Sequence, residues 1–143
     1  MDEAWVGSDY VGTSTPPPNR HEAEDAIISQ GVVATNHLNY SGTGFVDYTN
    51  VAGSYVEFTV AATAAGPVPV VARFANGSTT NRPMDVIVNG STAVAGQAFN
   101  PTGNWDTWAT VTVTVTLAAG SNTIRLTATT ANGGPNLDKI TVG

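Results

Sequence analysis

Three acidic side chains occupy positions where the surrounding pattern favours apolar ones. In the segment 21–28, which alternates like an extended strand, Glu22 and Glu24 share a face with apolar neighbours. Asp138 alternates in the same way within the last apolar segment of the chain. Isolated buried carboxylates are too costly to tolerate, and a ligand set made only of oxygens suits a hard cation. The pattern therefore indicates a metal site; the alternative is that Glu22 and Glu24 lie on a solvated edge strand and Asp138 caps a turn.

Aromatic residues next to turn residues are candidates for ligand binding. Tyr40 lies in the segment 39–44 and Trp105 in the segment 103–108, both rich in Gly, Asn, Ser and Thr. Sugar sites combine such aromatic faces with side-chain amides and charges. Trp108 enters a valine-rich strand and is expected in the core, which leaves Trp105 as the binding residue. The alternative for Trp105 is a loop anchor at one end of the fold.

Two polar residues at strand ends extend this candidate set. Arg82 precedes Pro83 at the start of an apolar segment, and its guanidinium can pair bidentately with a carboxylate. Its alternative is a salt bridge with Asp85 or Glu57. Asn136 follows Gly-Gly-Pro at the mouth of the last apolar segment, where its amide either faces a ligand or satisfies a turn.

These candidates must be positioned by β-strands, because apolar side chains alternate with a period of two from residue 20 onward. Turn clusters of Asn, Gly and Ser separate the alternating segments, and no helical spacing competes with them. About eight short strands of this kind predict an all-β protein, a β-sandwich of the jelly-roll type. The expected strands, after a first one at 21–28, span 54–60, 68–74, 84–89, 110–117, 123–128 and 137–142.

Composition restricts the possible functions. The 143 residues include no cysteine, so disulfides, thiolate metal sites and a cysteine nucleophile are excluded. Only 11% of residues are charged, the net charge is −6, and five basic residues are scattered along the chain. Nucleic acids and anionic membranes are therefore poor partners, and no apolar run approaches the 18 residues of a membrane span. The Thr-, Asn- and Gly-rich composition is typical of an extracellular β-protein.

The chain is expected to divide near residue 19. Residues 1–19 are expected to lie outside the fold: residues 1–11 are the end of a preceding domain or an expression remnant, and residues 12–19 are a Thr/Pro-rich tether. Residues 20–143 form one module. Three consecutive prolines at 16–18 favour an extended linker.

Catalysis finds little support in the sequence. His21 and His37 have no serine in a nucleophile-elbow setting nearby, and glycine-rich phosphate loops and paired-histidine metal motifs are absent from the sequence. Several loop carboxylates exist, but nothing selects two of them as a glycosidase pair. The protein is therefore not expected to be an enzyme; a small lyase or hydrolase and a purely structural sandwich remain the alternatives.

A set of short motifs in order along residues 20–143 resembles carbohydrate-binding module family 35, a relative of family 6. No single motif is specific, but the ordered set is. The motifs are His21-Glu22-Ala23-Glu24-Asp25-Ala26, Tyr40-Ser41-Gly42-Thr43-Gly44-Phe45-Val46-Asp47-Tyr48, Gly53-Ser54-Tyr55-Val56-Glu57-Phe58, Arg73-Phe74-Ala75-Asn76-Gly77, Arg82-Pro83, Val88-Asn89-Gly90, Trp105-Asp106-Thr107-Trp108 and Gly133-Gly134-Pro135-Asn136-Leu137-Asp138.

The resemblance implies a jelly roll with a structural calcium and a sugar site in loops at one end. The calcium ligands correspond to Glu22, Glu24 and Asp138, with backbone carbonyls from 41–44. One branch of the family binds glucuronic or unsaturated galacturonic acid through a second calcium, for which Asp47 is a candidate; other branches bind mannan or α-galactose. Because an arginine suits an anionic sugar, we expect a uronic acid. The sugar-binding residues carried over are Tyr40, Arg82, Trp105 and Asn136, with Asn76 as a further candidate.

The resemblance also implies the setting in which the module works. Such modules are attached to secreted glycan-degrading enzymes and hold the catalytic domain near polysaccharide. We therefore expect an extracellular, monomeric, calcium-dependent module whose partners are a polysaccharide and a covalently linked catalytic domain.

Overall fold

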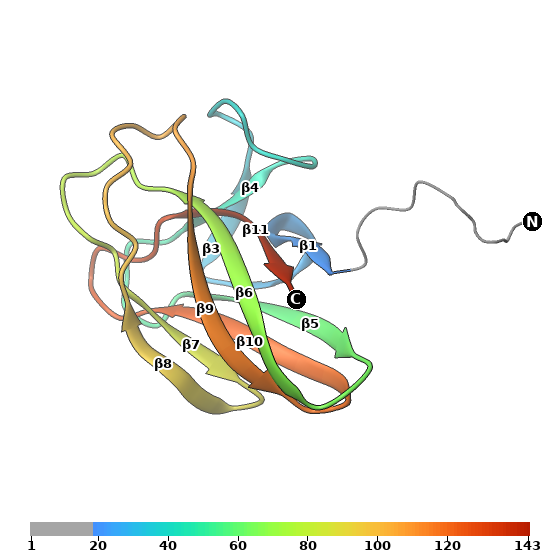
Figure 1. Ribbon diagram of the computed structural model, residues 1–143. Coiled ribbons are helices and arrows are strands. Elements are labelled where there is room, and N and C mark those ends of the chain that lie inside the picture. Colours follow the sequence, from blue (N-terminus) through green and yellow to red (C-terminus); the bar gives the residue numbers. More distant parts are fainter. Residues whose placement is uncertain (1–18) are drawn as a thin grey trace, which may run out of the picture.

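The alternating segments form two antiparallel β-sheets that pack face to face (Figure 1). The computed structural model describes residues 19–143. The expected tether therefore lies outside the described residues, apart from Asn19, whose carbonyl accepts a hydrogen bond from Val142 N (2.9 Å). The described part contains no helix long and apolar enough to cross a membrane.

The first sheet has six strands, and its central strand is the last one in the chain. β11 (Asn136–Val142) pairs with β4 and β1 along one edge and with β6 along the other. The remaining strands complete the order β3-β4-β11-β6-β9, with β1 (Arg20–Glu22), β3 (Gly31–Ala34), β4 (Phe45–Tyr48), β6 (Gly66–Ala75) and β9 (Ala109–Leu117).

The second sheet has five strands in the order β2-β5-β10-β7-β8. Its longest pairing joins β5 and β10, with eight residue pairs between Gly120↔Ala62 and Thr127↔Tyr55. The strands are β2 (Ile27–Ser29), β5 (Tyr55–Ala62), β7 (Met84–Val88), β8 (Ser91–Gln97) and β10 (Gly120–Ala128).

The core lies between the two sheets and is built by the predicted inward-facing residues. In β5, Val56, Phe58 and Val60 are at most 2% exposed, whereas the alternate residues face outward. β10 buries Ile124 and Leu126 in the same way. The prediction of an all-β sandwich is thus confirmed, and the strands at 54–60, 68–74, 84–89, 110–117, 123–128 and 137–142 all occur to within a few residues.

The prediction of one strand over 21–28 is wrong. β1 pairs with β11 in the first sheet and β2 pairs with β5 in the second, so the chain crosses between the sheets within this segment. A 3₁₀ turn, η1 (Ala23–Asp25), makes the crossing, with Ala23 fully buried. Glu24 therefore lies in a turn and does not share a strand face with Glu22.

Three further strands were not predicted. β3 and β4 have four residues each, too few for a clear alternating pattern. β8 is an edge strand of mostly small residues and buries none of them fully. The loops that follow β3, β6 and β8 gather at the upper end of the sandwich in Figure 1, and this end carries the candidate site.

Candidate functional site

A polar pocket of about 230 Å³ opens at this loop end. Asp47 of β4 is paired with Asn136 of β11 in the antiparallel register. These two polar residues are therefore neighbours at the end of the first sheet. The other lining residues come from loops, which bring the full set to His37, Asp47, Asn50, Arg82, Trp105 and Asn136. The structure thus brings together four residues singled out in the sequence, Asp47, Arg82, Trp105 and Asn136.

Arg82 supplies a positive charge that the described residues leave without an acidic partner. Its Nη1 makes only long contacts, 3.3 Å to Gly134 O and 3.5 Å to Asn50 Oδ1, and its Nε is buried without a hydrogen-bond partner. Partial burial lowers the pKa of the Arg82 guanidinium, which the nearby Asp47 carboxylate partly offsets, although an arginine remains charged. The pocket therefore holds a cation with unused donors.

The alternative pairing of Arg82 with Asp85 or Glu57 is not found. Glu57 Oε1 instead pairs with Arg125, 2.6 Å from Nη2, on the second sheet. Asp85 Oδ1 accepts a hydrogen bond from Gly96 N at 2.8 Å. Both carboxylates are thus committed elsewhere, and Arg82 points into the pocket.

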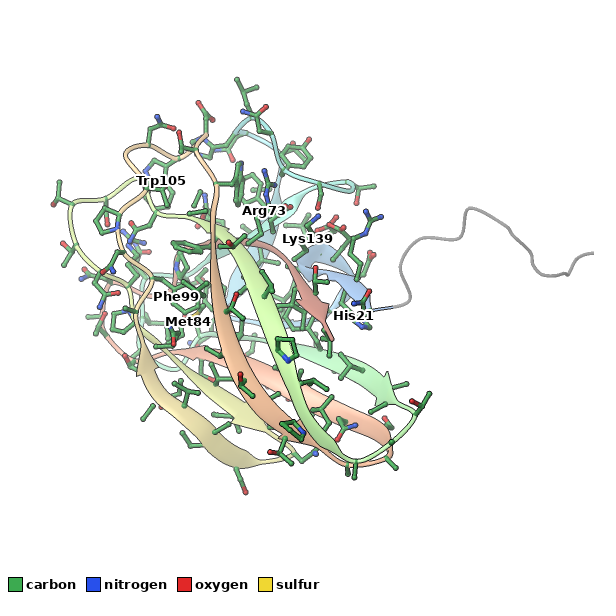
Figure 2. All side chains as sticks on the ribbon, in the orientation of Figure 1. His21, Arg73, Met84, Phe99, Trp105 and Lys139 are labelled. Carbon is green, nitrogen blue, oxygen red and sulfur yellow. The ribbon has the colours of Figure 1, made fainter. Side chains whose placement is uncertain are left out.

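Trp105 forms one wall of the pocket and is held by a glycine. A Cβ placed on Gly77 would overlap the pyrrole part of the Trp105 indole, so the backbone at Gly77 lies directly against the ring. The guanidinium of Arg82 lies 5.2 Å from the ring centre, and the His37 ring lies 6.3 Å away. The half-buried Trp105 is therefore fixed beside the charge of Arg82. Figure 2 shows Trp105 among the loops at the upper end of the sandwich.

Asn76 does not line the pocket. Its side chain is fully buried, its amide nitrogen donates to Thr80 O and Phe99 O at 2.9 Å each, and its Oδ1 accepts from Ser78. The expectation that Asn76 contacts the ligand is therefore wrong, because every polar atom of this amide holds the loop that leads to Arg82.

Tyr40 and Trp108 also lie elsewhere than expected. Tyr40 does not line the pocket; its ring packs at 5.8 Å from Phe45. Trp108 is only half-buried and lies outside the main core. Its ring packs edge-on against Phe45, with 5.5 Å between the ring centres, and its Nε1 donates a hydrogen bond to Leu38 O at 2.7 Å. Trp108 thus binds the loop 35–44 through Leu38 O and is not the core residue that was expected. The expected role of Tyr40 in ligand binding stays a prediction.

Two residues that line the pocket, His37 and Asn50, were not predicted from the sequence. His37 Nδ1 lies 3.2 Å from Asp106 Oδ1, which also accepts a hydrogen bond from Leu38 N at 2.9 Å. This carboxylate joins the loops 35–44 and 98–108 above the pocket. Asn50 lies two residues after the end of β4, the strand that carries Asp47. Its closeness to Asp47 in the sequence was the only feature from which its place in the pocket could have been predicted.

The three acidic residues expected to bind metal lie on one side of the same loop. Ser41 Oγ donates to Glu22 Oε1 (2.7 Å), Thr43 N donates to Glu24 Oε2 (2.9 Å), and Ser41 N donates to Asp138 Oδ1 (2.9 Å). We call Glu22, Glu24 and Asp138 the acidic cluster. The loop 41–44 therefore brings them together even though Glu24 lies in a turn.

Several features of the acidic cluster fit a hard cation. Glu22 Oε2 and Glu24 Oε1 are buried without a hydrogen-bond partner in the described structure. Burial raises the pKa of Glu24, and the charges of Glu22 and Asp138 add to this effect. A Cβ on Gly42 would overlap Glu24 Oε2, so glycine leaves the space between loop and carboxylates open. By contrast, within residues 19–143 no group of three or more His, Cys, Asp or Glu side chains is arranged so that it could hold a metal ion by itself. A cation at the acidic cluster would therefore need oxygen ligands from the loop as well.

Comparisons with known proteins agree with this geometry. The family model described as carbohydrate binding module (family 6) matches residues 22–143. A family 35 carbohydrate-binding module from Clostridium thermocellum superimposes with a TM-score of 0.85 at 40% identity, covering 86% of this chain and 95% of that one. A module called Xyl-CBM35, solved with a disaccharide that contains glucuronic acid, gives 0.80 at 35% identity and covers 87% and 91%.

Curated relatives are much longer enzymes. An exo-β-D-glucosaminidase of Amycolatopsis orientalis is 57% identical over 137 residues, which are 96% of this chain but 13% of that protein. Endo-1,4-β-xylanase B of Cellvibrio japonicus is 38% identical over 113 residues, 78% of this chain and 19% of that protein. The family model covers most of the described residues, and the solved modules match almost over their full length. The chain therefore belongs to the carbohydrate-binding modules of family 35, relatives of family 6.

Proposed function

We propose that the module recognises a glycan through a uronic acid, with the sugar carboxylate paired to Arg82. The observation that carries this proposal is the unpaired guanidinium of Arg82 in the pocket, with its Nε buried and unused. A guanidinium binds a carboxylate through two parallel hydrogen bonds, and each charged hydrogen bond contributes about 1.5–3 kcal/mol. A neutral sugar would leave this charge without a partner.

The other pocket residues suit the rest of a single sugar unit. Trp105 offers an apolar wall for the C–H groups of a ring, while Asn50 and Asn136 offer amides that donate and accept hydrogen bonds. His37 adds a further polar edge. The small volume, about 230 Å³, favours one terminal or branching sugar over a long chain segment.

The relatives support this choice. A glucuronic acid-containing disaccharide is bound by one solved module that is 35% identical to this chain. Other relatives act on neutral sugars: a cycloisomaltooligosaccharide glucanotransferase of Niallia circulans is 40% identical over 130 residues. A neutral glucan is therefore the competing ligand, and the charge on Arg82 favours the uronic acid.

Calcium is the cation that we propose for the acidic cluster. Glu22, Glu24 and Asp138 would hold it together with carbonyl oxygens of residues 41–44, because hard divalent cations take six to eight oxygen ligands. Bound there, it would neutralise carboxylates that are otherwise buried close together. For the second calcium implied by the family, Asp47 is the acidic side chain present in the pocket.

We propose that the module itself performs no catalysis and serves an attached enzyme. Several solved neighbours are isolated binding modules, and the curated relatives carry the matching segment as 10–19% of a glycan-active enzyme. Attachment to polysaccharide outside the cell raises the effective concentration of substrate around a linked catalytic domain.

Calorimetry on the module tests the proposal directly. Glucuronic acid, galacturonic acid, glucose, mannose and galactose are titrated in calcium and in chelator. We expect heat of binding for the uronic acids only, reduced or absent in chelator. Equal affinity for glucose and glucuronic acid, or a preference for mannose or galactose, would overturn the uronic acid assignment and leave the carbohydrate-binding family intact.

A further inference from the structure

One loop belongs to both sites. The segment 35–44 joins β3 to β4, and its second half donates three hydrogen bonds to the acidic cluster, from Ser41 and Thr43. Its first half carries His37 into the wall of the sugar pocket and is bonded to Asp106 of the facing loop. The same loop therefore contacts the acidic cluster with one half and forms a wall of the pocket with the other.

Arg73 of β6 contacts this arrangement at three points. Its Nη1 donates to Asp138 Oδ2 (2.6 Å) in the acidic cluster and to Asn39 O (2.9 Å) in the middle of the loop. Its guanidinium carbon lies 5.3 Å from the centre of the Trp108 ring, and Trp108 Nε1 in turn donates to Leu38 O. Arg73 lies on the sheet below the loops in Figure 2, where Trp105 marks the pocket.

We propose that Arg73 is a positioning residue that couples the acidic cluster to the sugar pocket. A cation in the acidic cluster fixes Asp138 and the second half of the loop. Arg73, which is bonded to Asp138, is then fixed as well and holds Asn39 and Trp108 in place. The first half of the loop, with His37, is thereby fixed at the pocket. The coupling rests on the proposed function, because it presumes a cation in the cluster and a sugar in the pocket. By linkage the effect is reciprocal, so a bound sugar tightens cation binding by the same factor.

The chemistry of the arginine side chain explains why this position needs it. The guanidinium separates its contacts over several atoms: Nη1 bonds Asp138 and Asn39, while the central carbon lies beside the Trp108 ring. A lysine ammonium has enough donors for the two hydrogen bonds, but it is a compact charge and would have to make these bonds and the ring contact from one nitrogen atom. The competing view is that Arg73 merely neutralises Asp138, which predicts that lysine preserves everything the arginine does.

The first test needs no sugar. The sequence contains two histidines, His21 and His37, so ¹³C-histidine labelling gives two imidazole signals, and His37→Gln assigns them. Calcium added to the wild-type protein should raise the melting temperature and shift the His37 signal together. A rise in melting temperature with an unmoved His37 signal would overturn the proposal.

Three variants locate the effect. Glu24→Gln should abolish both responses; a His37 shift that survives in this variant would come from calcium in the pocket and would contradict the coupling. Arg73→Lys should keep most of the stabilisation by calcium and lose most of the His37 shift. Arg125→Lys is the matched control, since Arg125 also pairs with a glutamate and lies 3.8 Å over an aromatic ring, Tyr55, but on the other sheet. It should behave like wild type.

The second test measures sugar affinity at saturating calcium. Glu24→Gln should weaken glucuronic acid binding at least about 5-fold, the lower end of typical coupling between sites, although Glu24 does not line the pocket. In a protein that already carries Arg73→Lys, Glu24→Gln should lower the affinity for glucuronic acid by a smaller factor than in wild type. If the two substitutions lower the affinity independently, so that their free-energy effects add, the proposal is overturned. If no sugar binds at all, the proposed function fails, while the His37 signal still decides the coupling. If Arg73→Lys does not fold, the wild-type and Glu24→Gln titrations still decide whether the two sites are coupled. Trp108→Phe, which removes the hydrogen bond to Leu38 O, then tests the route through Arg73: an unchanged His37 shift in this variant would overturn that route.

Discussion

The guanidinium carbon of Arg82 lies 5.2 Å from the centre of the Trp105 ring, and both residues line the same pocket. The two come from different loops, which follow β6 and β8. A sugar that enters beside them meets a charge and an apolar wall at adjacent positions. This pairing of a charge with a ring is the geometric reason for expecting an acidic sugar.

Replacing Arg82 by lysine should weaken uronic acid binding by roughly tenfold or more. The ammonium keeps the charge but loses the bidentate geometry, and one charged hydrogen bond contributes about 1.5–3 kcal/mol. Calorimetry with glucuronic acid measures the loss, and the melting temperature should stay within a few degrees. Arg125→Lys, on the second sheet, is the control and should bind like wild type. Unchanged affinity in Arg82→Lys would remove this residue from the site.

Trp105 and Trp108 should differ in what their loss affects. Trp105→Ala removes a pocket wall and should abolish most sugar binding with a small loss of stability. Trp108→Ala removes a half-buried ring that packs on Phe45 and Arg73, so it should destabilise the fold, though by less than the roughly 3–5 kcal/mol of a fully buried aromatic. Thermal unfolding and calorimetry on both variants check this. A reversal, with Trp105→Ala unfolding and Trp108→Ala losing only affinity, would exchange their roles.

Gly77→Ala should lower sugar affinity without straining the backbone. The new Cβ would overlap the Trp105 ring, so the indole must move into or away from the pocket. Gly77 does not lie in the left-handed region, and alanine is therefore tolerated by the main chain. Near-ultraviolet circular dichroism should report the displaced ring, and calorimetry the lost affinity. Wild-type affinity in this variant would mean that the position of the ring does not matter to the ligand.

The fold was largely predictable because alternation within a strand is a local signal. The burial of Asp138 was predicted because it alternates with the apolar residues of β11 and so shares their face of the strand. The structure confirms that Asp138 is fully buried. The same reasoning failed for Glu24, because no local signal in 21–28 announces that the chain leaves one sheet for the other at Ala23.

The pocket was predictable only in part because its residues are distant in the sequence. His37 and Asp106 are 69 positions apart and meet only through the packing of two loops. Asn76 and Arg82 lie in one loop, yet the first is a buried structural amide and the second faces the pocket. Residue type alone marks both as candidates, and only the hydrogen bonds of Asn76 distinguish them.

Stability should fall above about pH 10 because of Tyr48. Its hydroxyl donates to Leu126 O at 2.9 Å, and complete burial of the ring raises the pKa of this phenol far above its ordinary value. In the unfolded chain the phenol ionises near pH 10, so above that pH the folded state holds one more proton. The free energy of unfolding then decreases by about 1.4 kcal/mol per pH unit.

The Tyr48→Phe variant isolates this effect. It should lose roughly 1 kcal/mol at neutral pH, from the missing hydrogen bond, but lack the alkaline decrease that Tyr48 causes. Denaturant titrations between pH 8 and pH 11 on both proteins give the comparison. Parallel pH profiles would show that another group controls the alkaline behaviour.

Gly42→Ala should remove stabilisation by calcium, and Gly53→Ala should not. Both glycines are exposed and have a positive φ, 63° and 92°, so alanine strains the backbone at each by about 1–3 kcal/mol. Only at Gly42 does the new Cβ overlap Glu24 and approach Glu22 Oε1 to 2.8 Å, whereas nothing lies within 4 Å of it at Gly53. At about 100 times its dissociation constant, calcium adds about 2.7 kcal/mol to wild type, or roughly 5–10 °C in melting temperature. Melting curves in calcium and in chelator should show this difference in wild type and Gly53→Ala and lose it in Gly42→Ala. If Gly42→Ala responds to calcium as strongly as Gly53→Ala, the cation does not bind between this loop and the acidic cluster.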